Sequence, residues 1–198
     1  MRIGIYGGTF DPPHLGHNNV AINVSKILNL ETLIVVPTAK NPLKDNTKVS
    51  SEHRYNMCKL MFEKIPNIIV SDYEIYKKTP VYTVDTLEYM HKIFKDDELF
   101  LIIGDDNLKS IHKWKNIERI CELAKIALCP RLGYNAIEKQ PSYLRNAYVY
   151  LDKIEAFDMS STYVREKFDI LEDYSNVLDE DVVEYIRSNK LYERKNYD

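Results

Sequence analysis

The chain has 198 residues, 44% of them hydrophobic, which is enough for a single domain over residues 1–198 with a sizeable core. The net charge of −3 argues against a general polyanion binder, so we expect no nucleic-acid partner. No apolar run approaches the roughly 20 residues of a membrane span, and MRIGIYGG reaches glycine too early for a secretory signal. The three cysteines lack metal-ligand spacing, which favours free thiols and a cytoplasmic location.

Short apolar runs alternate with amphipathic stretches along the chain. The runs predict strands at residues 2–6, 33–37, 67–71, 99–104, 125–129 and 147–151. They are continuously hydrophobic, which indicates a sheet that is covered on both faces.

Helical periodicity lies between these runs. Apolar stripes at 20–28, 55–62 and 84–94 predict three helices, the second with a cap at Ser51. The polar segment AKNPLKDNTKVSSE predicts a long loop, and closing helices are expected within about 160–192. The order of elements predicts an α/β fold, a Rossmann-like parallel sheet with helices on both faces.

The stretch YGGTFDPPHLGH crowds structure-breaking residues between the first strand and the first helix. Gly7 and Gly8 allow a tight turn and a close approach of the backbone to a bound group. His14 and His17 share a helix face if the helix starts near His14, and Gly16 leaves room for a ligand. Because helix-start N–H groups attract anions, the cluster predicts a phosphate site. A plain turn with two surface histidines is the alternative, and a zinc site is disfavoured because a third ligand is missing.

The segment SSTYVREKF repeats this arrangement near the end of the chain. Ser160 and Ser161 fit an N-cap, and the N–H groups of Ser161 and Thr162 would face a phosphate. Arg165 can reach back over the same anion, because helical side chains lean toward the N-terminus. An ordinary capped helix is the alternative for this segment alone.

Together these motifs resemble the signature of the His-x-x-His nucleotidyltransferases, and most closely bacterial nicotinate mononucleotide adenylyltransferases. The resemblance continues in order through PTAKNPLK, TPVYTVDTL, LIIGDDNLKSIHKW and CPRLG. It implies transfer of AMP from ATP to nicotinate mononucleotide, forming nicotinate adenine dinucleotide and pyrophosphate in NAD biosynthesis. Magnesium is expected to arrive with ATP, without dedicated protein ligands. The family often forms homo-oligomers, and the sequence leaves the oligomeric state open.

The resemblance also implies roles for individual residues. The attacking group is an anionic phosphate, so catalysis reduces to aligning two phosphates and stabilising charge, with His17 as the transition-state stabiliser. The residues expected to act on the triphosphate are His14, His17, Lys44 and Arg165. The further ATP-binding residues expected are Gly7, Gly8, Thr9, Phe10, Gly16, Arg131, Phe157, Ser160, Ser161 and Thr162. The residues expected to bind the mononucleotide are Thr83, Gly104, Asp106, Trp114 and Lys115.

The chain departs from the family pattern at Leu43, Asp105, Lys115 and Lys190, where a histidine, an alanine, a tyrosine and a glycine are common. The first three concern substrate choice, and we expect the acid to be preferred over the amide. Two alternatives stay open. One is a related adenylyltransferase that acts on nicotinamide mononucleotide or pantetheine phosphate, and the other is a non-catalytic nucleotide-binding regulator.

Overall fold

The computed structural model describes residues 1–39, 47–77, 79–131, 144, 148–154, 159–167 and 173–193.

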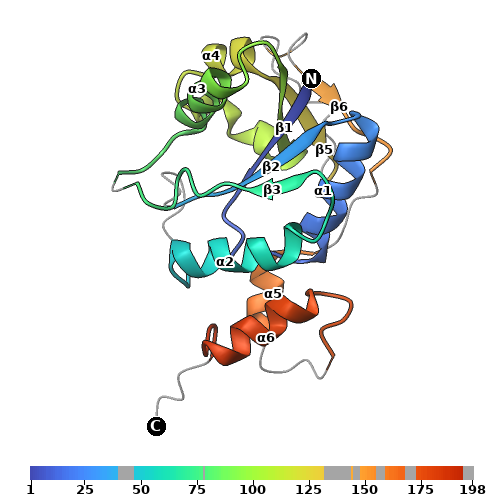
Figure 1. Ribbon diagram of the computed structural model, residues 1–198, viewed down its shortest axis with the longest axis vertical. Coiled ribbons are helices and arrows are strands. Elements are labelled where there is room, and N and C mark those ends of the chain that lie inside the picture. Colours follow the sequence, from blue (N-terminus) through green and yellow to red (C-terminus); the bar gives the residue numbers. More distant parts are fainter. Residues whose placement is uncertain are drawn as a thin grey trace.

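Within these residues, six parallel strands form the central sheet (Figure 1). They are β1 (Arg2–Gly8), β2 (Thr32–Pro37), β3 (Ile68–Val70), β4 (Glu98–Gly104), β5 (Lys125–Cys129) and β6 (Tyr148–Tyr150). Their order is β3-β2-β1-β4-β5-β6, and every neighbouring pair is parallel. The predicted strands and the predicted fold class are confirmed. The strand order reverses between β1 and β4, which is where open α/β sheets bind ligands.

The helices cover both faces of the sheet. They are α1 (Leu15–Ile27), α2 (Ser51–Phe62), α3 (Thr83–Ile93), α4 (Ile117–Leu123), α5 (Ser161–Lys167) and α6 (Glu180–Ser188). In Figure 1, α3 and α4 lie on one side of the sheet, α1 and α2 on the other, and α5 and α6 beyond α2. None of the helices in the described ranges is long and apolar enough to cross a membrane.

The helix boundaries differ from the sequence prediction in two places. The cap of α2 is Ser50 rather than Ser51, because the Ser50 side chain accepts a hydrogen bond from the His53 N–H. The short helix α4 and the 3₁₀ segments Asp105–Lys109 and Ile111–Lys113 had not been predicted. They are too short to show a clear helical period in the sequence.

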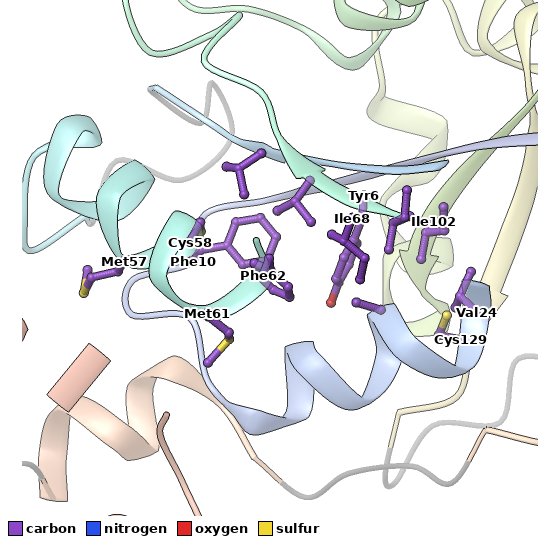
Figure 2. Close-up of a cluster of buried hydrophobic side chains, with 14 of the residues drawn as sticks. Tyr6, Phe10, Val24, Met57, Cys58, Met61, Phe62, Ile68, Ile102 and Cys129 are labelled. Carbon is purple, nitrogen blue, oxygen red and sulfur yellow. The ribbon is translucent and has the colours of Figure 1, made fainter. Parts of the chain in front are cut away.

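Successive residues of the central strands face opposite sides of the sheet, and each side has its own hydrophobic cluster. Figure 2 shows the cluster on the α1–α2 side, where Tyr6 packs with Val24 and Phe62. On the opposite side Ile5 packs with residues of α3 and α4, such as Leu87. The central strands β1, β2, β4 and β5 are therefore buried on both faces, as their hydrophobic runs predict. The edge strands β3 and β6 differ, because each has a neighbour on one side only and exposes a residue, Ile69 and Val149.

Candidate active site

A cavity of about 660 Å³ lies at the carboxyl ends of β1, β4 and β5. The starts of α1 and α3 and the 3₁₀ segments that follow β4 complete its wall. The cavity therefore occupies the point where the strand order reverses, the expected position for a ligand in this class of fold.

Most of the predicted site residues meet in this cavity, although they come from distant parts of the sequence. Those that line it are Gly7, Gly8, Thr9, Phe10, His14, Gly16, His17, Thr83, Gly104, Asp106, Trp114, Lys115, Arg131 and Ser161. Ser160, Thr162 and Arg165 do not belong to its lining. Lys44, Leu43 and Phe157 lie outside the described residues.

His14 and His17 lie side by side at the start of α1 and both line the cavity, as the sequence predicts. His14 has extended backbone angles and is the N-cap of α1, whereas His17 lies in the first turn. The His14 N–H donates to Nδ1 of His17 (3.1 Å), and the two rings lie with centroids 3.7 Å apart and planes tilted by 32°. Because Nδ1 of His17 accepts this bond, a neutral His17 ring carries its proton on Nε2. His17 therefore presents Nε2–H as its free donor.

Both imidazoles are neutral at physiological pH in this structure. Burial, followed by the charge of Arg131, lowers the pKa of His14 to about 3. Burial and then His14 hold the pKa of His17 well below its usual range, since its ring packs 4.9 Å from that of Phe10. A bound phosphate would oppose this shift, because a nearby negative charge favours the protonated ring.

The signature loop after β1 is fastened to the C-terminal part of the chain. The Ser161 hydroxyl donates to the Pro12 carbonyl (2.9 Å), and Nη1 of Arg165 donates to the Asp11 carbonyl. Arg165 thus contacts the backbone of the loop instead of lining the cavity. Ser160 caps α5, since its hydroxyl accepts from the Tyr163 N–H (3.1 Å), as the sequence predicts.

Asp105 and Asp106 point in different directions from the end of β4. Asp105 is buried and accepts from the Arg131 N–H (3.0 Å) and the Tyr150 hydroxyl (3.4 Å), and burial raises its pKa. Asp106 instead faces the cavity, with Oδ1 3.9 Å from Nε of Arg131. The extra carboxylate of Asp105 therefore connects β4 to β5 and β6 and adds no acceptor to the cavity.

Lys115 lies at the rim of the cavity beside the start of α3. Its Nζ is 4.4 Å from the ring centroid of Tyr82 and 3.5 Å from Oδ1 of Asp85. The Asp85 side chain also accepts from the Tyr82 N–H (3.1 Å), so it occupies one donor at the helix start. The positive charge of Lys115, which directly follows Trp114 in the sequence, is therefore shared with Asp85.

The comparisons with known proteins agree with this geometry. Residues 5–167 match the cytidylyltransferase-like family. The chain is 36% identical over 210 residues to the "Probable nicotinate-nucleotide adenylyltransferase" of Shewanella frigidimarina, covering 97% of this chain and 100% of that protein. It is 40% identical over 155 residues to the protein of the same name from Aquifex aeolicus, covering 78% and 90%. The chain belongs to the nicotinate-nucleotide adenylyltransferase family.

Solved structures share the fold of this family member. The nicotinic acid mononucleotide adenylyltransferase of Plasmodium falciparum, complexed with APC, matches with a TM-score of 0.76 at 20% identity, covering 96% of each chain. A structure of the same protein complexed with NaAD has the same TM-score and covers 96% of this chain and 97% of that one.

Two buried charged residues of this adenylyltransferase family member escaped the sequence prediction. Glu74 is 5% exposed and lines the cavity, while Arg54 is 0% exposed and lies in α2. Arg54 precedes Met57, Cys58 and Met61 at helical spacing, so its place on the buried stripe could have been recognised. Glu74 lies in a turn, where periodicity carries no such signal.

Proposed function

We propose that this chain transfers AMP from ATP to nicotinate mononucleotide, releasing nicotinate adenine dinucleotide and pyrophosphate. The observation that carries the proposal is one cavity that joins two kinds of surface. The histidine pair and glycine turn after β1 suit an anionic triphosphate, and Trp114 with the start of α3 suits an aromatic ring. The relatives named above support the choice of the nicotinate acid as acceptor.

The reaction needs no protein nucleophile, because the mononucleotide phosphate attacks the α-phosphate of ATP and pyrophosphate leaves. The protein must align the two phosphates and stabilise the charge that develops. We assign this task to Nε2–H of His17, which the hydrogen bond from His14 orients. His14 would contact the triphosphate beside it. Lys44 and the remaining guanidinium N–H groups of Arg165 are proposed as further phosphate contacts.

The mononucleotide would occupy the other half of the cavity. Trp114 would stack on the pyridine ring, and Thr83 with the free N–H groups at the start of α3 would bind its carboxylate. Asp106 would accept hydrogen bonds from ribose hydroxyls, as carboxylates do in dinucleotide-binding folds. On the nucleotide side, Arg131 and Ser161 would complete the ATP pocket.

We propose that magnesium reaches the site with ATP. Among the described residues, no group of three or more histidine, cysteine or acidic side chains could hold a metal ion. The ion would be held by triphosphate oxygens and water, and it would neutralise phosphate charge. The three cysteines are free, which fits the cytoplasmic location that we also propose.

The decisive experiment compares acceptors. Purified protein with ATP is offered nicotinate mononucleotide, nicotinamide mononucleotide or pantetheine phosphate, and dinucleotide and pyrophosphate are quantified. We expect the acid to exceed the amide by at least ~10-fold in kcat/KM, or about 1.4 kcal/mol, because buried donors matched to a carboxylate lose partners with an amide. Equal rates on both mononucleotides would refute the acid preference. ATP binding without turnover on any acceptor would indicate the non-catalytic regulator.

Lys115 variants refine the same test. Lys115→Tyr should leave the acid preferred, because the donors at the start of α3 remain. Lys115→Glu should weaken the preference, because it places a second carboxylate beside Asp85 at the rim of the cavity. An unchanged ratio in Lys115→Glu would remove Lys115 from the substrate-binding residues.

A further inference from the structure

Arg54 is the largest side chain that is fully buried among the described residues. Burial of a guanidinium group is costly unless its N–H groups are bonded and its charge is balanced. Burial lowers the pKa of the Arg54 guanidinium from its usual value, and the negative charge of Asp11 opposes this shift by favouring the protonated form. Because burial of this guanidinium group costs free energy, we expect Arg54 to have a role other than filling space in the core.

The guanidinium group joins two loops at the edge of the cavity. Its Nη1 donates to the Thr9 carbonyl (2.6 Å), and its Nη2 donates to the Ala39 carbonyl (2.9 Å). Thr9 directly follows β1, and Ala39 lies two residues after the end of β2. The strands β1 and β2 are parallel neighbours in the sheet. Its Nε is buried without a partner among the described residues, so the side chain forgoes one hydrogen bond while keeping these two.

The bridge begins where the sheet ends. A backbone hydrogen bond still joins the Thr38 N–H to the Gly8 carbonyl (2.9 Å). Thr9 follows Gly8 and Ala39 follows Thr38, and these two residues are the ones that Arg54 connects. The planar guanidinium fork holds its N–H groups in fixed directions toward both carbonyl groups. A lysine ammonium also has several donors, but it is a compact charge on a flexible stem and does not fix this geometry.

The bridge also orients a peptide unit that borders the cavity. In a planar trans peptide the C=O and N–H bonds point in opposite directions. With the Thr9 carbonyl held toward Arg54, the Phe10 N–H is turned away from that side chain. Both Thr9 and Phe10 line the cavity, and the Phe10 ring packs on Phe62 of α2, near which Figure 2 also shows it.

We propose that Arg54 is a positioning residue for adenylyl transfer, which holds the first residues of the loops after β1 and β2, Thr9 and Ala39, in fixed positions beside the ATP side of the cavity. The inference rests on the proposed function, because it assigns these loops to ATP. Arg54 itself does not line the cavity. It acts through the Thr9 and Ala39 backbones, so its loss should affect ATP more than the mononucleotide.

The test compares Arg54→Lys, which keeps the charge and loses the fork, with the unmodified protein. We expect kcat to fall about 10- to 100-fold, the size of effect produced by a misplacement of roughly 1 Å. The KM for ATP should rise several-fold. Binding of nicotinate mononucleotide, followed by the fluorescence of Trp114, the single tryptophan of the chain, should change less than about twofold.

Arg119→Lys is the matched control, because Arg119 also makes two side-chain bonds, to Glu88 and Glu122, but at the surface and outside the cavity lining. It should leave all three parameters unchanged. Arg54→Ala with added guanidinium, at concentrations far below denaturation, gives a second readout. Partial recovery of kcat with guanidinium, but not with ammonium at equal ionic strength, would support a requirement for the planar guanidinium group of Arg54.

Three results would overturn the proposal. The first is wild-type kinetics in folded Arg54→Lys. The second is a parallel loss of ATP affinity, mononucleotide affinity and thermal stability, which would make Arg54 a purely structural residue. The third is a failure of guanidinium to restore folded Arg54→Ala. If the unmodified protein makes no dinucleotide, the proposed function fails. The role of Arg54 can still be tested by calorimetry of ATP binding. A tenfold lower ATP affinity in Arg54→Lys would support that role, and an unchanged affinity would overturn it.

Discussion

At the residue scale, the hydrogen bond between His14 and His17 decides which atom of His17 can act. The bond occupies Nδ1, so Nε2–H is the group left for a ligand. The Nδ1 position of a histidine can be replaced by the amide oxygen of an asparagine, which also accepts. The two functions of the ring, as acceptor for the helix cap and as donor for phosphate, can therefore be separated.

We predict that His17→Asn and His17→Ala both lower kcat by about 10²–10³, the usual cost of losing one donor to a developing charge. Only His17→Ala should also lose stability, because only it removes the acceptor for the His14 N–H. The measurements are steady-state kinetics and thermal unfolding, with exposed His112→Ala as the control. Unchanged kcat with a raised KM for ATP would mean that His17 binds ATP only in the ground state.

Gly7 and Gly8 are adjacent but differ in the space around them. A Cβ on Gly7 would have no heavy atom within 4 Å, and Gly7 lines the cavity. A Cβ on Gly8 would lie 2.8 Å from the Phe10 ring, which packs in the core.

We therefore predict opposite consequences for the two alanine variants. Gly7→Ala should keep the melting temperature and raise the KM for ATP, because its methyl group enters the cavity. Gly8→Ala should lower the melting temperature, because a ring in a packed core must move, at a typical cost of 1–3 kcal/mol. If kcat and the KM for ATP of Gly7→Ala equal those of the unmodified protein, ATP does not bind next to Gly7.

At the scale of elements, α1 and α6 end in the same way. In each, the residue after the C-cap is left-handed, Asn29 with φ 49° and Lys190 with φ 52°. The following residues, Leu30 and Leu191, donate back to carbonyls inside the helix and are buried. This is the Schellman arrangement, which usually has glycine at the left-handed position. Lys190 therefore fills the place of the glycine that the family pattern leads one to expect.

We predict that Lys190→Gly increases the free energy of unfolding by roughly 0.5–1 kcal/mol, since glycine avoids the left-handed penalty but loses more chain entropy on folding. Asn29→Gly should gain less, because asparagine tolerates this conformation. Urea unfolding of both variants measures the difference. An equal gain at both sites, or a loss at Lys190, would contradict this account.

At the scale of the whole molecule, buried titratable groups set the dependence of stability on pH. The pKa of His14 falls to about 3, from an ordinary value of 6.5, and that of His17 is also lowered. Below pH 6.5 the unfolded chain therefore binds more protons, and the stability from these histidines, complete above about pH 6.5, is lost as the pH falls toward 3. Glu74 acts in the opposite sense, because burial raises its pKa from 4.5 to about 7. Its contribution is complete below pH 4.5 and is lost as the pH rises through 7.

We predict that Glu74→Gln becomes more stable relative to the unmodified protein as the pH rises from 5 to 8. The amide keeps an acceptor for the Thr86 hydroxyl and removes the buried charge that forms at high pH. The difference in free energy of unfolding should grow by about 1 kcal/mol or more across this range. Denaturant unfolding at several pH values gives the measurement, and a difference that is constant with pH would refute a raised pKa of Glu74.

The strands, the fold class and the position of the glycine–histidine stretch beside the cavity could all be predicted from the sequence. Hydrophobic runs of four to six residues such as RIGIY and LFLIIG reflect burial on both faces of a sheet, and this is a local pattern. The histidines and glycines of the first turn are likewise neighbours along the chain. Local spacing was enough to place them at the carboxyl end of a strand.

Only the tertiary structure decided how distant residues pair. It placed Arg165 against the backbone of Asp11, Asp105 against Arg131 and Tyr150, and Lys115 beside Asp85. It also turned His14 into a helix cap and put Arg54 between two loops. The physical reason is that a sequence pattern records which side chains must leave water. Which buried donor meets which acceptor depends on strands and helices that approach one another only when the sheet has assembled.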